Sequence, residues 1–227
     1  MKTTFHYAQH GLIWLALSLG CMFLTACGGE SGPVNYKRGV YLLLDTSGTY
    51  TEELQKAQQI INYLLASLES GDTFVVARID SGSFSEKDIV AKVELDSRPS
   101  TANQQKREFA ANIDEFVQSV RSSAYTDISG GLLQAIEYLN EADVGSKHIF
   151  IFSDLKEELP EDFVRDFDFT LDGFTVKALN VTKLRSDNVN PQEYMQRVAD
   201  WEARIEQGGG SWGMVNDLDR PDALALN

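Results

Sequence analysis

The chain has 227 residues and a formal net charge of −14, with 43% hydrophobic and 24% charged residues. This length suits one full-sized domain, and this composition excludes both wholesale disorder and a polytopic membrane protein. Because the net charge is strongly negative, we do not expect the chain to bind nucleic acid.

Residues 1–26 have the features of a signal peptide. Lys2 precedes an uncharged run over residues 11–26, which is shorter than the roughly 20 apolar residues that a membrane-spanning helix needs. Residues 24–27 (LTAC) resemble the bacterial lipobox, in which the signal is cleaved before a cysteine whose thiol has been acylated. The resemblance implies that a lipid on Cys27 attaches the chain to a membrane, and an uncleaved anchor is the alternative.

Lipidation would also limit the location and the chemistry of the protein. Gly28 stands where lipoproteins retained in the inner membrane carry Asp, so the resemblance implies the outer membrane of a Gram-negative envelope, at its periplasmic or surface face. Signal removal takes away Cys21 and the lipid occupies Cys27, so neither a disulfide nor a free thiol remains. His148 is then the sole histidine. These losses exclude a cysteine nucleophile and a His/Cys zinc site.

After the signal, the chain is predicted to consist of a tether, one domain and a tail. Residues 27–38 begin with the lipidated cysteine and are rich in Gly and Ser, which is typical of a flexible tether. Residues 39–215 form the predicted domain, and residues 216–227 are expected to be a loosely held tail. Within the domain, the acidic residues of 157–172 predict a solvated face with a short helix.

Strands and helices alternate through the domain. Apolar runs and apolar periodicity predict strands at 40–44, 73–79, 89–95, 149–152 and 174–181, and helices at 52–70, 103–120, 129–142 and 192–207. This order predicts a doubly wound α/β fold with a mostly parallel central sheet, helices on both faces, and residues 89–95 as an antiparallel edge strand. A ligand is then expected outside the carboxyl ends of the strands.

Three oxygen-bearing side chains follow the first strand at alternate positions. They are Asp45, Ser47 and Thr49, and they lie where the predicted fold places a ligand. Oxygen is the ligand atom that a hard cation such as Mg²⁺ prefers. The motif alone is not specific, because loops between strands and helices often contain Asp, Ser and Gly to turn the chain and to cap the helix.

Two further features stand at matching places. Thr126 comes just before a helix, and Asp154 ends a later buried strand. Together with the first motif, they resemble the von Willebrand factor A family, in which these positions form the metal-ion-dependent adhesion site. The resemblance implies that the hydroxyls of Ser47, Thr49 and Thr126 coordinate Mg²⁺, with Mn²⁺ or Ca²⁺ as other possible ions. It also implies that Asp45 and Asp154 contact the ion mainly through water. The sequence departs mildly from the family pattern at Thr49, where Ser is commoner.

Other polar residues have simpler interpretations. Asp127 stands at a helix entrance, where a carboxylate caps backbone N–H groups, and we favour this role over direct metal ligation. His148 begins a buried strand and is interpreted as structural. Trp212 follows a glycine run, and the sequence does not decide between the core and an exposed contact.

The family resemblance implies a binding module rather than an enzyme. A protein ligand would present an Asp or Glu that completes the coordination shell of Mg²⁺. One alternative is a phosphoryl-transfer enzyme of the haloacid-dehalogenase type with Asp45 as nucleophile, although such enzymes use a D-x-D motif and Ser47 occupies the second acidic position. Another is a scaffold protein whose metal site is silent.

Overall fold

The described part of the chain is built on one six-stranded sheet. The computed structural model describes residues 34–226 apart from 81, 83, 162, 164, 166, 219 and 220. The strands are β1 (Arg38–Asp45), β2 (Thr73–Ile79), β3 (Ile89–Glu94), β4 (Ser146–Phe152), β5 (Phe174–Leu179) and β6 (Ser211–Val215). Their order is β3-β2-β1-β4-β5-β6, and every neighbouring pair is parallel except β2 and β3. The predicted fold class, including the antiparallel edge strand, is therefore confirmed.

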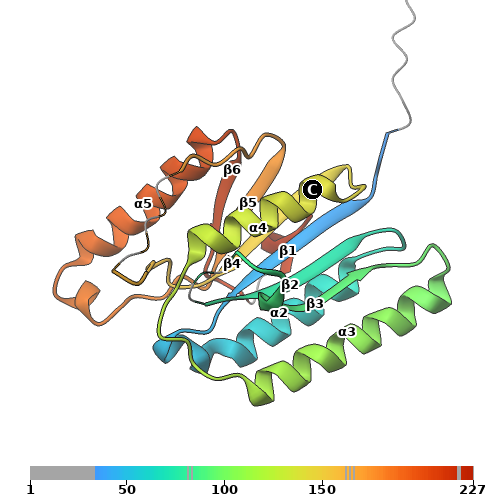
Figure 1. Ribbon diagram of the computed structural model, residues 1–227, viewed down its shortest axis with the longest axis horizontal. Helices are drawn as coiled ribbons and strands as arrows, with labels where there is room; N and C mark the ends of the chain where they lie inside the picture. The colour runs from blue at the N-terminus through green and yellow to red at the C-terminus, as the bar shows by residue number, and fades with distance from the viewer. Residues whose placement is uncertain are drawn as a thin grey trace, which may run out of the picture. The chain divides into compact units, whose positions relative to one another are not determined.

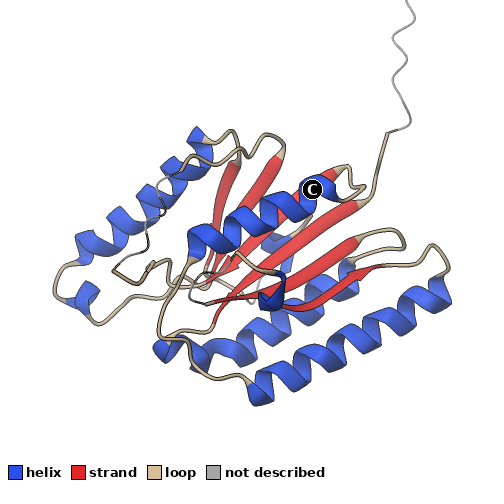
Figure 2. Cartoon of the chain, in the orientation of Figure 1, coloured by secondary structure: helices blue, strands red, loops and turns tan. Residues whose placement is uncertain are grey.

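Helices cover both faces of the sheet (Figure 1). They are α2 (Leu54–Ser67), α3 (Pro99–Ser119), α4 (Ile128–Glu141) and α5 (Pro191–Gln207). Figure 2 shows the strands as one layer between them, with α2 and α3 packed on one face and α4 and α5 on the other. Helix α3 begins four residues before the predicted start because proline is favoured in a first helical turn. In the described part of the chain, no helix combines the length and apolar character needed to cross a bilayer.

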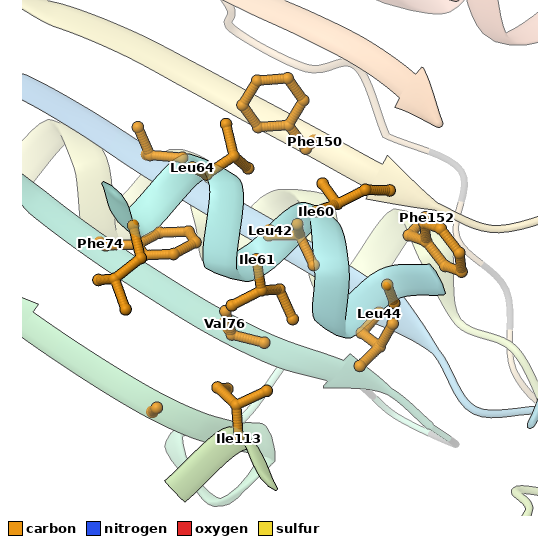
Figure 3. Close-up of a cluster of buried hydrophobic side chains, with 14 of the residues drawn as sticks. Leu42, Leu44, Ile60, Ile61, Leu64, Phe74, Val76, Ile113, Phe150 and Phe152 are labelled. Carbon is orange, nitrogen blue, oxygen red and sulfur yellow. The ribbon is translucent and has the colours of Figure 1, made fainter. Parts of the chain in front are cut away.

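The buried run of β1 supplies both halves of the core. Alternate side chains of a strand point to opposite faces, so Leu42 and Leu44 pack against α2 while Tyr41 and Leu43 pack toward α4. Figure 3 shows the first of these clusters, in which Ile61 of α2 lies over the sheet. Burying one such aliphatic side chain stabilises the folded state by about 1.5–3 kcal/mol. The buried residues of β1 therefore stabilise the centre of the sheet, from which the loops of the site extend.

The strand β6 was not predicted from the sequence. It follows three glycines and contains Gly213, and such a segment carries little intrinsic strand preference. It forms because its residues pair in register with β5, from Thr175 with Ser211 to Leu179 with Val215. Trp212, which the sequence left undecided, packs partly buried against the core on the α5 side.

Part of the predicted tail, around Leu224, packs against the core rather than being loosely held. Leu224, in a short 3-10 helix, is 2% exposed and belongs to the core on the α2 side. The ammonium of Lys177 in β5 donates hydrogen bonds to the carbonyl oxygens of Ala223 and Ala225, each at 3.1 Å. These contacts hold this part of the tail against β5 and the core on the α2 side.

The acidic segment 157–172 also departs from its predicted form. Phe169 and Leu171 are buried in the core on the α5 side, so the segment is not a solvated face throughout. Among its described residues no helix is formed. The apolar residues near its end determine its path, because burying two large side chains outweighs the solvation of a few acidic neighbours.

The predictions for residues 1–33, which include the signal peptide, Cys27 and most of the tether, lie outside the described residues.

Candidate metal centre

Three loops meet at one edge of the sheet. β1 and β4 are parallel neighbours, so the loops that follow their carboxyl ends leave the sheet side by side (Figure 1). The loop after β1 contacts the loop before α4, because the Ser123 N–H donates to the carbonyl oxygen of Thr46 at 2.9 Å. Thr126 in turn exchanges two backbone hydrogen bonds with Glu158, at 2.8 and 3.0 Å, and Glu158 lies in the loop after β4. The fold thus brings the three motif-bearing loops together.

Asp45 lies at the base of this edge. Its side chain is 0% exposed, Oδ1 accepts the backbone N–H of Ser47 at 2.8 Å, and Oδ2 accepts the Ser153 hydroxyl at 2.6 Å. Burial raises the pKa of Asp45, and the hydrogen bonds from Ser153 and Ser47 oppose that rise. Its carboxylate is therefore held in one orientation and connected directly to the residue before Asp154.

Asp154 is the second carboxylate of the site. Its Oδ1 accepts the backbone N–H of Lys156 at 2.8 Å. Burial and the neighbouring charge of Asp45 raise the pKa of Asp154 to about 6, although the Lys156 hydrogen bond and the positive charge of Arg197 act in the opposite direction. Within the described residues, neither Asp45 nor Asp154 forms an ion pair with a basic side chain. The two carboxylates therefore repel one another at this edge, and the positive charges of Arg197 and Lys156 offset the effect on Asp154 only in part.

The candidate hydroxyl ligands have different environments. Thr126 is buried, and Ser47 is half-buried at the start of the loop. The carbonyl of Ser47 accepts the Tyr50 N–H at 2.9 Å, which fixes the backbone between them in a 3-10 helix, Gly48–Glu53. Thr49 lies in that helix, and its side chain is outside what the structure describes. The roles of these hydroxyls as ligands stay predictions.

Asp127 has the capping role that the sequence favoured. Its Oδ1 accepts the N–H of Gly130 in the first turn of α4 at 2.8 Å. Its other carboxylate oxygen pairs with the Arg165 guanidinium at 2.6 Å, and the Asp127 side chain is completely buried. With its carboxylate occupied by a cap and by an arginine, Asp127 is a structural residue beside the site.

Two contacts around the site were not predicted from the sequence. Arg165 lies 38 residues from Asp127, and no local pattern marks such a pair. Ser153 precedes Asp154 in the sequence, and its hydroxyl donates to Asp45 and accepts the N–H of Leu155 at 3.0 Å. A hydroxyl that directly follows a wholly apolar strand was the signal that could have identified it.

The donor set suits a hard divalent cation. The described part of the chain holds no group of three or more His, Cys, Asp or Glu side chains placed to bind a metal. Soft metals that need thiolate or imidazole ligands therefore find no such cluster there. The carboxylates of Asp45 and Asp154, with neutral hydroxyls in the neighbouring loops, instead provide oxygen atoms and negative charge, which Mg²⁺ and Mn²⁺ prefer. Such an ion would also relieve the repulsion between Asp45 and Asp154.

Several solved structures are similar to this chain. The pilus adhesin SpaC from Lactobacillus rhamnosus GG, in its open conformation, has a TM-score of 0.52 and 13% identity, covering 87% of this chain and 30% of that chain. A von Willebrand factor type A structure from Catenulispora acidiphila has a TM-score of 0.47 and 14% identity, covering 82% of this chain and 40% of that chain. The manganese-loaded Plasmodium vivax TRAP protein has a TM-score of 0.44 and 16% identity, covering 83% of this chain and 74% of that chain.

No family model matches the chain, and no curated protein matches it. The chain spans less than half the length of the SpaC and Catenulispora acidiphila chains, so it corresponds to one part of each. At 13% identity, the likeness to SpaC shows a common fold alone. The chain therefore has the doubly wound α/β fold shared with that adhesin, and its function must be argued from the loops at the carboxyl edge of the sheet.

Proposed function

We propose that this protein is a lipid-anchored envelope protein that binds a protein partner through a divalent cation, with Mg²⁺ as the ion. The observation that carries the proposal is a pair of carboxylates, the buried Asp45 and the half-buried Asp154, at the edge where the loops of Ser47 and Thr126 also meet. Neither forms an ion pair with a basic side chain among the described residues. The resemblance of these positions, with Thr49, to the adhesion site of von Willebrand factor A domains supports it.

The expected chemistry follows from the charges. The hydroxyls of Ser47, Thr49 and Thr126 would hold the ion, and Asp45 and Asp154 would orient water around it. Neutral ligands leave a divalent cation with much of its charge, so the bound ion attracts an Asp or Glu of the partner. The carboxylate of Asp45 is oriented for this role because it accepts hydrogen bonds from the Ser153 hydroxyl and the Ser47 N–H.

Capture of a partner should depend on both the ion and Asp154. The full chain is immobilised in detergent and exposed to envelope extract in Mg²⁺ or in EDTA, and bound proteins are identified by mass spectrometry. We expect a partner to be captured in Mg²⁺ but not in EDTA, and we expect the Asp154→Asn variant to capture no partner in either condition. The matched control is Asp143→Asn, which removes the same charge from an exposed carboxylate that pairs with Lys37. Capture of the same protein in EDTA would instead favour a scaffold with a silent site.

An enzymatic role receives less support from the geometry. In the phosphoryl-transfer alternative, Asp45 would be the nucleophile, yet both of its oxygens accept hydrogen bonds and its side chain is 0% exposed. A nucleophile must approach its substrate within contact distance. We therefore propose binding without turnover.

Lipidation has its own test in the two cysteines of the chain. Cys27→Ser should abolish both acylation and signal removal, because the thiol is the group that receives the lipid. Cys21→Ser is the matched control, since it removes a thiol from the same segment but leaves the lipobox intact. Metabolic labelling with palmitate and the mass of the cellular protein give the readout. A processed, labelled Cys27→Ser protein would contradict the anchor.

A further inference from the structure

We propose that Trp201 and Arg197 of α5 are positioning residues for the cation site, and that they hold Asp154 in place through main-chain carbonyl oxygens. This inference rests on the proposed function, because it concerns how the same site keeps its geometry. It assigns a role to helix α5, whose residues lie outside the three motif-bearing loops.

The backbone next to Asp154 has an unusual conformation. Leu155 has a φ of 66°, in the left-handed region that favours glycine, and its side chain is 1% exposed. A leucine remains there only when its surroundings fix it, and such residues gather at functional sites. Glycine would remove the strain but would also empty a position in the core on the α5 side. The conformation of Leu155 must therefore be held by contacts.

Helix α5 provides these contacts from one face. Trp201 donates from indole Nε1 to the carbonyl oxygen of Leu155 at 3.0 Å, and Arg197 donates from Nε to the carbonyl oxygen of Asp154 at 2.9 Å. A spacing of four residues places both side chains on the same side of the helix. The Arg197 guanidinium is itself fixed by the buried carboxylate of Asp187, whose oxygens it contacts at 2.9 and 3.3 Å.

The backbone N–H groups of Leu155 and Lys156 connect the same segment to the two carboxylates of the site. The N–H of Leu155 donates to the Ser153 hydroxyl, which bonds Asp45, and the N–H of Lys156 donates to Oδ1 of Asp154 at 2.8 Å. The direction of the Lys156 N–H depends on the backbone of Leu155, the residue before it. If Leu155 leaves the left-handed region, the bond that orients the Asp154 carboxylate is lost. The donors on α5 thus control the second carboxylate of the site without touching it.

The test compares cation affinity with stability in the full chain. Trp201→Phe removes the indole donor but keeps an aromatic ring in the core, and Arg197→Lys keeps the charge that faces Asp187 but loses the Nε donor. Arg38→Met is the matched control, because it breaks an arginine pair with buried Asp72 at the amino end of β1. Mn²⁺ dissociation constants, melting temperatures in EDTA, and hydrogen exchange of the Leu155 and Lys156 amides in EDTA are measured.

Trp201→Phe is expected to raise the Mn²⁺ dissociation constant on the order of 10-fold and to speed exchange of the two amides. Arg197→Lys should change the dissociation constant in the same direction. Arg38→Met should lower the melting temperature and leave both the affinity and these amides as in the wild type. The inference is overturned if wild type binds Mn²⁺ and Trp201→Phe binds it equally well, or if Arg38→Met weakens binding as much. A wild-type protein that binds no Mn²⁺ overturns the proposed function together with this role.

Discussion

Asp45→Asn is expected to abolish stabilisation by Mg²⁺ and to leave the ion-free protein at least as stable as the wild type. Burial raises the pKa of Asp45 above its unfolded value, so ionisation of this carboxyl disfavours the folded state. Asparagine removes this charge and the repulsion with Asp154, and its oxygen still accepts the Ser47 N–H. At an ion concentration 100 times the dissociation constant, the free energy of unfolding of the wild type increases by about 2.7 kcal/mol. The variant should show no such increase.

Melting temperatures of both proteins in EDTA and in increasing Mg²⁺ give the readout. A gain of that size corresponds to a rise of roughly 5–10 °C for a domain of this length. Asp143→Asn, which neutralises an exposed carboxylate, should keep the full rise. The account is contradicted if Asp45→Asn still responds to the ion, or if it loses several degrees in EDTA.

Acid is expected to destabilise the protein through His148 by about 3 kcal/mol. Burial, with the positive charges of Lys177 and Arg38 nearby, lowers the pKa of His148 to about 4 from an ordinary 6.5, and Asp72 opposes this only in part. Because the pKa of His148 is lower in the folded chain than in the unfolded chain, between these two pKa values the unfolded chain binds a proton at His148 and the folded chain does not. The stability contribution is thus complete above about pH 6.5 and is lost as the pH falls toward about 4.

The comparison of wild type with His148→Gln isolates this effect. Glutamine does not titrate, and the buried carboxylates titrate in both proteins, so their contribution cancels in the difference. Unfolding free energies from urea titrations at pH 7 and at pH 4 should show the wild type losing about 3 kcal/mol more than the variant. Parallel pH curves for the two proteins would mean that His148 is not held in its neutral form by the fold.

The core of the fold was predictable because burial leaves a periodic trace in sequence. The apolar stripe predicted for the first helix, from Leu54 through Ile61 to Leu68 just after the end of α2, is buried as its spacing indicated. β6 left no such trace, since a short edge strand with Gly213 forms by pairing with a neighbour rather than by its own preference. The burial of Leu224 was missed for a similar reason, because it depends on contacts with distant residues such as Lys177 of β5, which holds the carbonyl oxygens of Ala223 and Ala225.

Some features of the candidate site could also be predicted from the sequence, and others could not. The positions of Asp45, Thr126 and Asp154 relative to strand ends were readable, because the order of a doubly wound sheet brings carboxyl ends together. The contacts that hold them were not readable. Arg165 pairs with Asp127, and Trp201 bonds Leu155 from 46 residues away, and such pairs depend on the three-dimensional path of the chain. The role of Thr49 stays a prediction, since its side chain lies outside the described residues.

The most direct test of the central claim is calorimetric titration of the full chain with Mn²⁺. The account predicts that the wild type and Asp143→Asn each bind one ion per chain, that Mg²⁺ competes for it, and that Asp45→Asn binds none at the same concentrations. A wild-type protein that takes up no ion, or an Asp45→Asn protein that binds the ion as the wild type does, would contradict a cation site at this edge of the sheet.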